Sequence, residues 1–319
     1  MTNQCKICAN SLGNQEFVVR EMLLGTRENF NYFRCSSCGC LQITEIPEDL
    51  SRFYPNENYY SFQQGEHRTF GKKLKSLFYK CAFNRCGDFL LRKRLWLRLL
   101  NRENAIKKTS SILDVGCGVG NLLQEMSTWG FKNLTGIDPF LEKDILYSSG
   151  VKVLKQNVFN HAGGPYDLIT LHHSFEHMEN PHLVFKRLNE MLKPNGFLVM
   201  RIPVSDGFAW RKYGTNWSAI QAPLHFFLYT TKSMTILSKK AGFVLKHIAH
   251  ESTEVQFLES EKYRRDISSS EHLDFSSKYV RAYKKQARRL NRIMDGDMAC
   301  FLFFKEGRNG EWSQLKNCK

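Results

Sequence analysis

The sequence lacks long hydrophobic runs, and no apolar stretch approaches the ~18 residues that a membrane-spanning helix requires. The first ten residues, MTNQCKICAN, lack the apolar core of a secretion signal. Internal repeats and low-complexity tracts are also absent from the sequence. We therefore expect a cytoplasmic globular protein, whose 319 residues suffice for one large core and a small additional module.

Acidic residues are scarce in two parts of this basic chain, which carries a net charge of +15. The segment 68–108 has thirteen Lys and Arg against two acids, and the segment 262–292 has ten against three. Such local charge indicates a surface that faces a nucleic acid, a membrane or a phosphate-bearing substrate. Solvated helical faces explain it equally well. Apolar spacing in 61–108 predicts basic helices that act as a linker or lid.

Ten cysteines are present, but their spacing does not suggest disulfides. Two C-x2-C pairs are separated by 26 residues, and their members are Cys5, Cys8, Cys35 and Cys38. Two such knuckles supply the four thiolates of a tetrahedral zinc site, which leaves no open position and is therefore structural. The x2 spacing favours Cys38 over Cys40 as the fourth ligand. An iron site or a redox pair is the alternative. Residues 1–60 are thus predicted to form a zinc-ribbon-like module.

From Ser110 onward, strand-like apolar runs alternate with helical patterns, which is typical of a parallel sheet covered by helices. We expect an α/β domain over 109–319, with a helical insertion over 251–295. The predicted strands are 111–115, 133–137, 152–155, 167–172, 196–202, 243–249 and 298–305. The predicted helices between them are 119–129, 140–149, 181–193 and 231–241.

A glycine-rich loop follows the first of these strands, in ILDVGCGVGNLL (112–123). Glycine at 116, 118 and 120 permits positive φ and lets a ligand lie against the backbone at the carboxyl end of the sheet. Asp138 ends the second strand, where an acid can accept hydrogen bonds from both hydroxyls of a ribose. The loop lacks the G-x-G-x-x-G of dinucleotide-binding folds.

This loop resembles motif I of the class I S-adenosylmethionine-dependent methyltransferases, and YDLITLHHSFEHMENP and LNEMLKPNGFLVMRIP follow in the order of that superfamily. The resemblance implies a Rossmann-like, seven-stranded sheet and S-adenosylmethionine (SAM) as cofactor. It implies that Gly116, Gly118 and Gly120 pack against the methionine part of SAM, and that Asp114 orients the loop or reaches the amino group through water. It also implies that Asp138 binds the ribose, that Asn157 and Val158 lie where the adenine amine binds, and that His172 and His173 lie beside the sulfonium. The loop residues implied are Asp114, Gly116, Cys117, Gly118 and Gly120.

The cysteine-paired front segment resembles that of bacterial methyltransferases of sugar and cell-surface polysaccharide pathways. It is also similar to the zinc-binding half of deoxysugar C-methyltransferases, which carry a further C-terminal domain for which this chain has no room. The resemblance therefore implies O-methylation of a sugar hydroxyl on a nucleotide-linked or lipid-linked glycan, with C-methylation of a deoxysugar as an alternative.

A hydroxyl acceptor must lose its proton, and a histidine with a pKa of ~6.5 suits that role. His225 in APLHFFLY is our first candidate for this base, and His177 in SFEHMEN is the second. A loop histidine with satisfied hydrogen bonds is the alternative for each. Aromatic rings that pack on a sugar, and a cation for a phosphate, are predicted from Trp210, Arg211, Tyr213 and Trp217, with Tyr59 and Tyr60 as a lid. This aromatic segment could instead pack on its own core.

Two other functions compete with glycan methylation. Basic helices and a zinc module also suit an RNA methyltransferase, although base-methylating enzymes commonly carry Asn/Asp-Pro-Pro-aromatic where this chain has HHSFEH. A non-catalytic binding module that kept the fold is the other. The basic segments further predict peripheral contact with an anionic membrane at the inner face.

Overall fold

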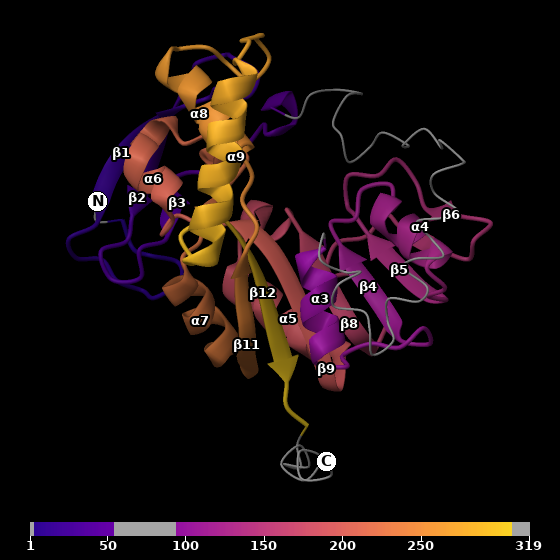
Figure 1. Ribbon diagram of the computed structural model, residues 1–319. Coiled ribbons are helices and arrows are strands. Elements are labelled where there is room, and N and C mark those ends of the chain that lie inside the picture. Colours follow the sequence, from indigo (N-terminus) through magenta and orange to yellow (C-terminus); the bar gives the residue numbers. More distant parts are fainter. Residues whose placement is uncertain (1–2, 54–93, 308–319) are drawn as a thin grey trace.

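The computed structural model describes residues 3–53 and 94–307 (Figure 1). Predictions that concern 54–93, including Tyr59, Tyr60 and most of the basic segment 61–108, lie outside the described residues. Two sheets organise the described part: an eight-stranded sheet with the order β11-β12-β9-β8-β4-β5-β7-β6, and a four-stranded sheet with the order β1-β2-β3-β10.

The large sheet contains all seven strands that the sequence predicts. Strands β7, β5, β4, β8 and β9 run parallel, whereas β12 is antiparallel to both β9 and β11. Chain order and sheet order differ most around β4, the first strand, which lies between β5 and β8. The bounds are β4 Ser111–Val115, β5 Asn133–Ile137, β6 Ile145–Leu146, β7 Lys152–Leu154, β8 Tyr166–His172, β9 Leu192–Pro203, β11 Phe243–His250 and β12 Met298–Lys305. The predicted Rossmann-like α/β sheet is confirmed.

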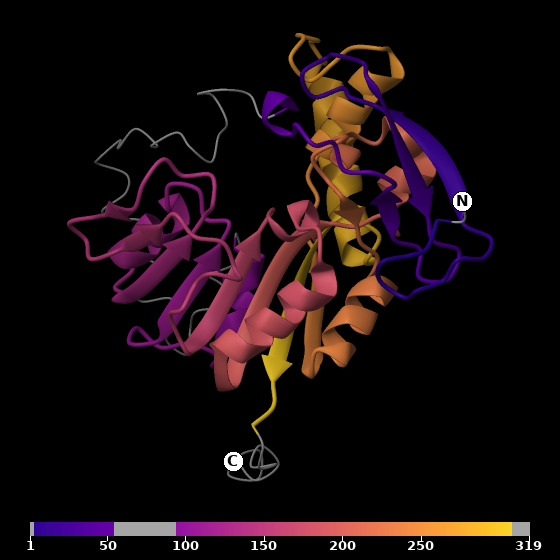
Figure 2. The same cartoon turned by 180° about the vertical axis from the view of Figure 1, so that it is seen from behind.

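Helices cover both faces of this sheet (Figures 1 and 2). Side chains alternate along β12, so that Phe301 and Phe303 join one core with α5 and α7, while Leu302 and Phe304 join a second core with α3 and α4. The bounds are α3 Leu95–Arg102, α4 Asn121–Thr128, α5 Pro181–Met191 and α7 Thr231–Lys240. The sheet is therefore apolar on both sides, as its near-continuous hydrophobic strands require.

The helix predicted over 140–149 is wrong. Turns and the short strand β6 occupy this segment, and β6 pairs antiparallel with β7. The Asp144 carboxylate accepts a hydrogen bond from the backbone N–H of Lys155 at 2.7 Å, which ties the segment to the end of β7. Only Leu141 is fully buried within 141–149, so a helix there would gain little from packing.

The four-stranded sheet joins the N-terminal segment to a distant part of the chain. Its strands are β1 Gln15–Arg20, β2 Asn29–Arg34, β3 Leu41–Ile43 and β10 Phe227–Leu228, and the short helix η1 spans Ser51–Phe53. Beside the β3–β10 pairing, the Tyr32 hydroxyl donates to the carbonyl of His225 at 2.9 Å, and the Thr230 hydroxyl donates to that of Cys38 at 2.6 Å. The cysteine-bearing segment thus forms one body with the segment around His225.

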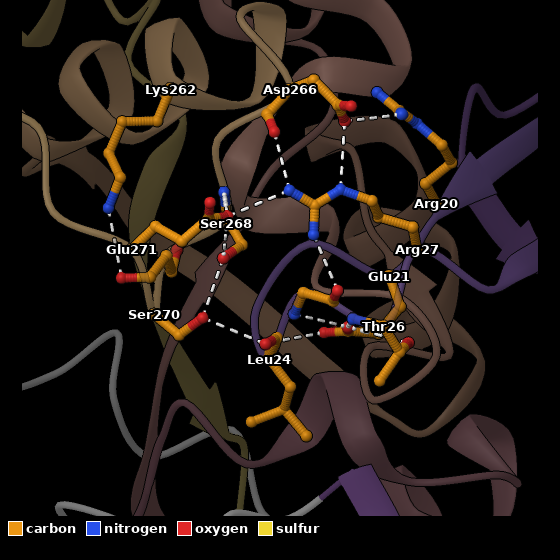
Figure 3. Close-up of polar contacts among 12 residues, drawn as sticks. Arg20, Glu21, Leu24, Thr26, Arg27, Lys262, Asp266, Ser268, Ser270 and Glu271 are labelled. Atoms are coloured by element: carbon orange, nitrogen blue, oxygen red, sulfur yellow. Dashed lines mark hydrogen bonds and ion pairs between the residues drawn. The ribbon is translucent and has the colours of Figure 1, made fainter.

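A second contact fixes the N-terminal segment to the region before α9 (Figure 3). Arg27 donates to the carbonyl of Asp266 at 2.7 Å and pairs with Glu271 at 2.9 Å, while Arg20 pairs with Asp266 at 2.7 Å. The buried Glu21 carboxylate accepts hydrogen bonds from the backbone N–H groups of residues 24–26 and so closes the loop that presents Arg27.

The segment 251–295 contains α8 Val255–Arg264 and α9 Ser277–Arg292. On α9, Tyr283, Ala287 and Leu290 are buried on one face, and the basic residues lie mostly at the surface. The remaining helices are α6 Phe208–Tyr213 and the single turns η3 Phe175–His177, η4 Gly214–Asn216 and η5 Ser218–Ile220. Within 3–53 and 94–307, no helix combines the length and apolar character needed to cross a membrane.

Candidate active site

A cavity of about 360 Å³ lies at the carboxyl ends of β4, β5, β7 and β8. This is the edge at which open α/β sheets bind ligands. Its walls come from four short segments that follow these strands. The lining residues are Val115, Gly116, Ile137–Phe140, Gln156–Phe159, His172–Ser174, His177–Asn180 and Val184.

Gly116 of the glycine loop lines the cavity with backbone and adds no side chain to it. Gly116 has φ +75°, and a Cβ added there would lie 2.4 Å from Cβ of Ser174. Gly120 has φ +79° at the start of α4, and a Cβ there would lie 2.6 Å from a methyl group of Val153. Both positions therefore require glycine, for backbone conformation and for space. Gly116 lines the cavity, whereas Gly118 and Gly120 shape the loop behind it.

Asp138 is a buried carboxylate on the cavity wall. Its Oδ2 accepts a hydrogen bond from the backbone N–H of Gly118 at 2.8 Å, and its Oδ1 accepts one from Phe140 at 3.0 Å. Burial raises the pKa of Asp138, while these two donors lower it. Each oxygen keeps acceptor capacity toward the cavity, which is the arrangement expected for an acid that binds two ribose hydroxyls.

Asp114 and Cys117 lie behind the cavity instead of lining it. The buried Asp114 carboxylate accepts a hydrogen bond from the Thr170 hydroxyl at 2.7 Å, and burial raises its pKa to about 7. The Cys117 sulfur packs against Gly136, where an added Cβ would lie 2.5 Å from it. These two residues hold the loop in place, so their predicted cofactor role is indirect in this geometry.

The wall beyond Asp138 carries two exposed aromatic rings that sequence reasoning missed. Phe140 is 65% exposed and Phe159 is 52% exposed, and both line the cavity. Asn157 and Val158 lie on the same wall, as predicted. The Asn157 side-chain oxygen accepts hydrogen bonds from the backbone N–H groups of Phe159 and Asn160 at 2.8 and 3.0 Å. Asn157 therefore shapes a turn, and the flanking phenylalanines offer faces on which a planar ring can pack.

His172 and His173 end β8 at the opposite side of the cavity, and both are neutral. Burial, with the nearby Arg201, lowers the pKa of His172 well below its usual value and that of His173 to about 4. His173 has φ +56°, and its backbone N–H donates to the carbonyl of Arg201 at 2.9 Å. Nε2 of His172 is buried without a hydrogen-bond partner among the described residues.

His177 and His225, our two candidate bases, lie together with rings 4.7 Å apart. His177 lines the cavity, whereas His225 is 6% exposed and lies outside the cavity lining. Burial lowers the pKa of His177 to about 4, and burial together with the neighbouring His177 lowers the pKa of His225 well below its usual value. The structure thus brings both candidates to one place, with His177 nearer the ligand space.

Glu176 lies beside this pair and was not singled out as a site residue. Its side chain is fully buried, and neither carboxylate oxygen has a hydrogen-bond partner within the part of the chain that the structure describes. Burial raises its pKa to about 8. The adjacency of Glu176 and His177 in SFEHMEN was the only signal in the sequence, and it carries no information about burial.

The predicted aromatic substrate site does not reach this cavity. Trp217 is buried and donates from its indole N–H to Asp297 at 2.9 Å, and the Tyr213 hydroxyl donates to Glu261 at 3.0 Å. Trp210 packs edge-on against Phe17 of β1, and Arg211 forms an ion pair with Asp295 at 2.7 Å. This segment packs on its own core, the alternative that the sequence left open.

The four predicted zinc ligands converge at a separate place. The sulfur atoms of Cys5, Cys8, Cys35 and Cys38 all lie within 4.8 Å of one another, whereas Cys40 points its thiol at the carbonyl of Leu41. Backbone N–H groups of Ile7 and Cys38 and the amide of Gln42 donate to these sulfurs. Such donors stabilise thiolates, so the donor set fits a structural zinc ion.

Comparison with known proteins places this geometry among methyltransferases. Residues 90–248 match a family model described as a methyltransferase domain. The chain is 29% identical over 154 residues to EEF1A lysine methyltransferase 2 of Danio rerio, covering 47% of this chain and 60% of that protein. It is 31% identical over 109 residues to the ubiquinone biosynthesis O-methyltransferase of Escherichia coli, covering 31% and 45%. The chain thus spans about half the length of these curated relatives.

Solved structures with similar folds include a SAM-dependent methyltransferase from Archaeoglobus fulgidus, at 17% identity and a TM-score of 0.42 over 67% of this chain and 94% of that one. The cyclopropane synthase MmaA2 from Mycobacterium tuberculosis has 18% identity and a TM-score of 0.41 over 65% and 84%.

Proposed function

We propose that the protein transfers the methyl group of SAM to a hydroxyl oxygen of its acceptor, most specifically a sugar hydroxyl on a nucleotide-linked or lipid-linked glycan. The match of residues 90–248 to a family model described as a methyltransferase domain supports the reaction class. The observation that carries this proposal is the cavity bounded by Gly116, Asp138 and His177. This cavity has room for a nucleoside, and the neutral imidazole of His177 lies at one end of it.

The proposed orientation of the cofactor in the cavity follows from the residues that line it. The ribose hydroxyls would donate hydrogen bonds to Asp138. The adenine would pack against Phe140, Val158 and Phe159, which lie on the same wall of the cavity. The methionine part would then follow Gly116 toward His172 and His173.

The acceptor end of the cavity favours a hydroxyl. Nδ1 of His177 donates to the carbonyl of Leu224 at 2.8 Å, so Nε2 carries the lone pair and can accept a hydrogen bond from an O–H group. A pKa near 4 makes this imidazole a weak base, however, and a sugar hydroxyl needs further acidification. His225 lies behind His177, so the proposal gives the first contact with the acceptor to His177.

A glycan acceptor is supported by the resemblance of the cysteine-paired segment to sugar-pathway methyltransferases and by a curated relative whose name describes O-methylation. The other curated relative is named a lysine methyltransferase, and the basic surface of α9 also suits RNA. We further propose that the four thiols hold zinc in a structural role, and that basic side chains hold the protein near anionic lipid.

The test is transfer of a labelled methyl group from SAM to separated acceptor pools of a bacterial lysate: RNA, protein, and a fraction of nucleotide-linked and lipid-linked glycans. Asp138→Asn serves as the control with weakened cofactor binding. Alkali-stable label in the glycan pool alone is the expected result. Label in RNA or protein alone would refute the glycan proposal, and the absence of label from all pools with SAM bound would refute methylation of these acceptor classes.

A further inference from the structure

Three side chains at the acceptor end of the cavity share the features of a metal site. One ligand atom each from Glu176, His177 and His225 lies within 4.8 Å of the other two. We propose that these residues bind a divalent transition-metal ion of the Zn²⁺ class, and that the ion binds the acceptor hydroxyl. This site is separate from the four thiols and rests on the proposed hydroxyl methylation for its role.

The two histidines are in the tautomer that a metal requires. Nδ1 of His177 donates to the carbonyl of Leu224 at 2.8 Å, and Nδ1 of His225 donates to the carbonyl of Ala219 at 2.7 Å. Carbonyl oxygens only accept, so both protons are on Nδ1 and both Nε2 atoms carry lone pairs. A backbone carbonyl behind the ring is the usual support of a metal-binding histidine.

Glu176 can supply the anionic ligand of this set. It is fully buried, and both carboxylate oxygens are without a hydrogen-bond partner among the residues described. Leaving such a group unpaired in a protein interior is unfavourable. Nearby polar groups do not relieve this: Nδ1 of His173 lies 3.8 Å from Oε1, and the buried Tyr229 hydroxyl also has no partner in the described part. A cation between Glu176 and the two imidazoles would remove the imbalance.

Two imidazoles and one carboxylate form the ligand set of catalytic zinc sites, which leave a position open. Bonds of ~2.0–2.1 Å in a tetrahedral site place ligand atoms roughly 3.3 Å apart. The three ligand atoms here all lie within 4.8 Å of one another, so side-chain rotation can bring them to that spacing. The open position faces the cavity, because His177 lines it while Glu176 and His225 lie behind. A structural site would have no such opening.

The ion would acidify the acceptor hydroxyl at the place where the methyl group is transferred. An oxygen bound to the ion loses its proton to solvent more readily, as zinc-bound water does. The oxygen lone pair then forms the new bond to the methyl carbon as the S–CH₃ bond breaks. The electron pair of the broken S–CH₃ bond stays on sulfur. The products are the methyl ether and S-adenosylhomocysteine. The positive charge of the sulfonium leaves as the released proton.

The test is Co²⁺ binding to protein whose four thiols already hold zinc, measured by equilibrium dialysis and metal analysis. Co²⁺ at nitrogen and oxygen ligands lacks the intense charge-transfer absorption of thiolate ligands, which distinguishes the two sites. Glu176→Gln and His177→Asn are the test variants. Glu190→Gln is the matched control, since Glu190 is an exposed carboxylate on α5 outside the cavity. S-adenosylhomocysteine binding checks that each variant is folded.

We expect wild type and Glu190→Gln to bind one Co²⁺ per chain beyond the zinc, and each test variant to bind it at least 10-fold more weakly. No additional Co²⁺ in wild-type protein, or equal affinity in Glu176→Gln, would overturn the metal site. Methyl transfer to a glycan by protein without this ion would leave the proposed function intact. If Co²⁺ binds but no hydroxyl is methylated, the metal site stands and the proposed function fails.

Discussion

Replacement of Asp138 by Asn tests the cofactor site most directly. The two carboxylate oxygens each accept a backbone N–H, from Gly118 at 2.8 Å and from Phe140 at 3.0 Å. An amide has one oxygen, so its NH₂ group must face one of these donors, and one hydrogen bond to a charged acceptor is lost. Such a bond is worth about 1.5–3 kcal/mol. We expect the free energy of unfolding to fall by about 1–3 kcal/mol.

The same change removes an acceptor for the ribose hydroxyls. A loss of about 1.5–3 kcal/mol in binding corresponds to a roughly 10- to 150-fold increase in the Kd of S-adenosylhomocysteine. Calorimetric titration measures this Kd, because this ligand does not turn over. Asp144→Asn is the control: Asp144 is exposed, lies outside the cavity, and accepts one backbone N–H that an amide oxygen can keep. A Kd for Asp138→Asn within twofold of wild type would refute the proposed position of the ribose.

Three further predictions concern the thiols, the glycine loop and a buried acid. Cys8→Ser should reduce bound zinc from about one ion per chain to nearly none and expose residues 3–53 to protease, because three thiolates hold the ion weakly; full zinc content by metal analysis would contradict this. Gly116→Ala should lower the free energy of unfolding, measured in urea, by about 1–3 kcal/mol, because residue 116 has φ +75° and the new Cβ would lie 2.4 Å from Cβ of Ser174. Gly150→Ala is the control for positive φ alone, because a Cβ at residue 150 would have no atom within 4 Å. Burial raises the pKa of Asp114 from 3.8 to about 7, so the folded protein holds a proton that the unfolded chain releases, and its stability declines as pH rises from about 4 to 7. In ligand-free protein, Asp114→Asn should make this decline smaller by an amount on the order of 2–4 kcal/mol. Parallel profiles of urea stability against pH for the two proteins would contradict this prediction.

Seven of the eight strands of the large sheet were predictable, because each has a local sequence pattern typical of a strand. Strand β4 and the glycine loop combine an apolar run, a terminal acid and three glycines within ten residues, and the structure gives β4 the predicted bounds. The helix expected over 140–149 failed because a few apolar residues at helical spacing do not decide between a helix and an edge strand. Tertiary pairing with β7 decided it.

The acceptor end could be predicted only in part. The sequence identified His177 and His225 as candidate bases. Their contact with each other and with Glu176 could not be predicted, because it is the fold that brings residue 225 next to residues 176–177. The aromatic segment was equally ambiguous, because the polar partners of Tyr213 and Trp217 are Glu261 and Asp297, far along the chain. Sequence spacing carries no signal for such contacts.

The small sheet has a consequence for synthesis of the chain. Tyr32 bonds to the carbonyl of His225, 193 residues later, and β3 pairs with β10 in the same region. At ~5–20 residues per second, a ribosome needs roughly 10–40 s to make the chain between these partners. During that interval β3, whose three residues are all buried in the folded protein, has an unpaired edge. The nascent protein must keep this edge of β3 from pairing with other strands until residue 228 has emerged from the ribosome. The small sheet is therefore completed only late in synthesis, when β10 becomes available to pair with β3.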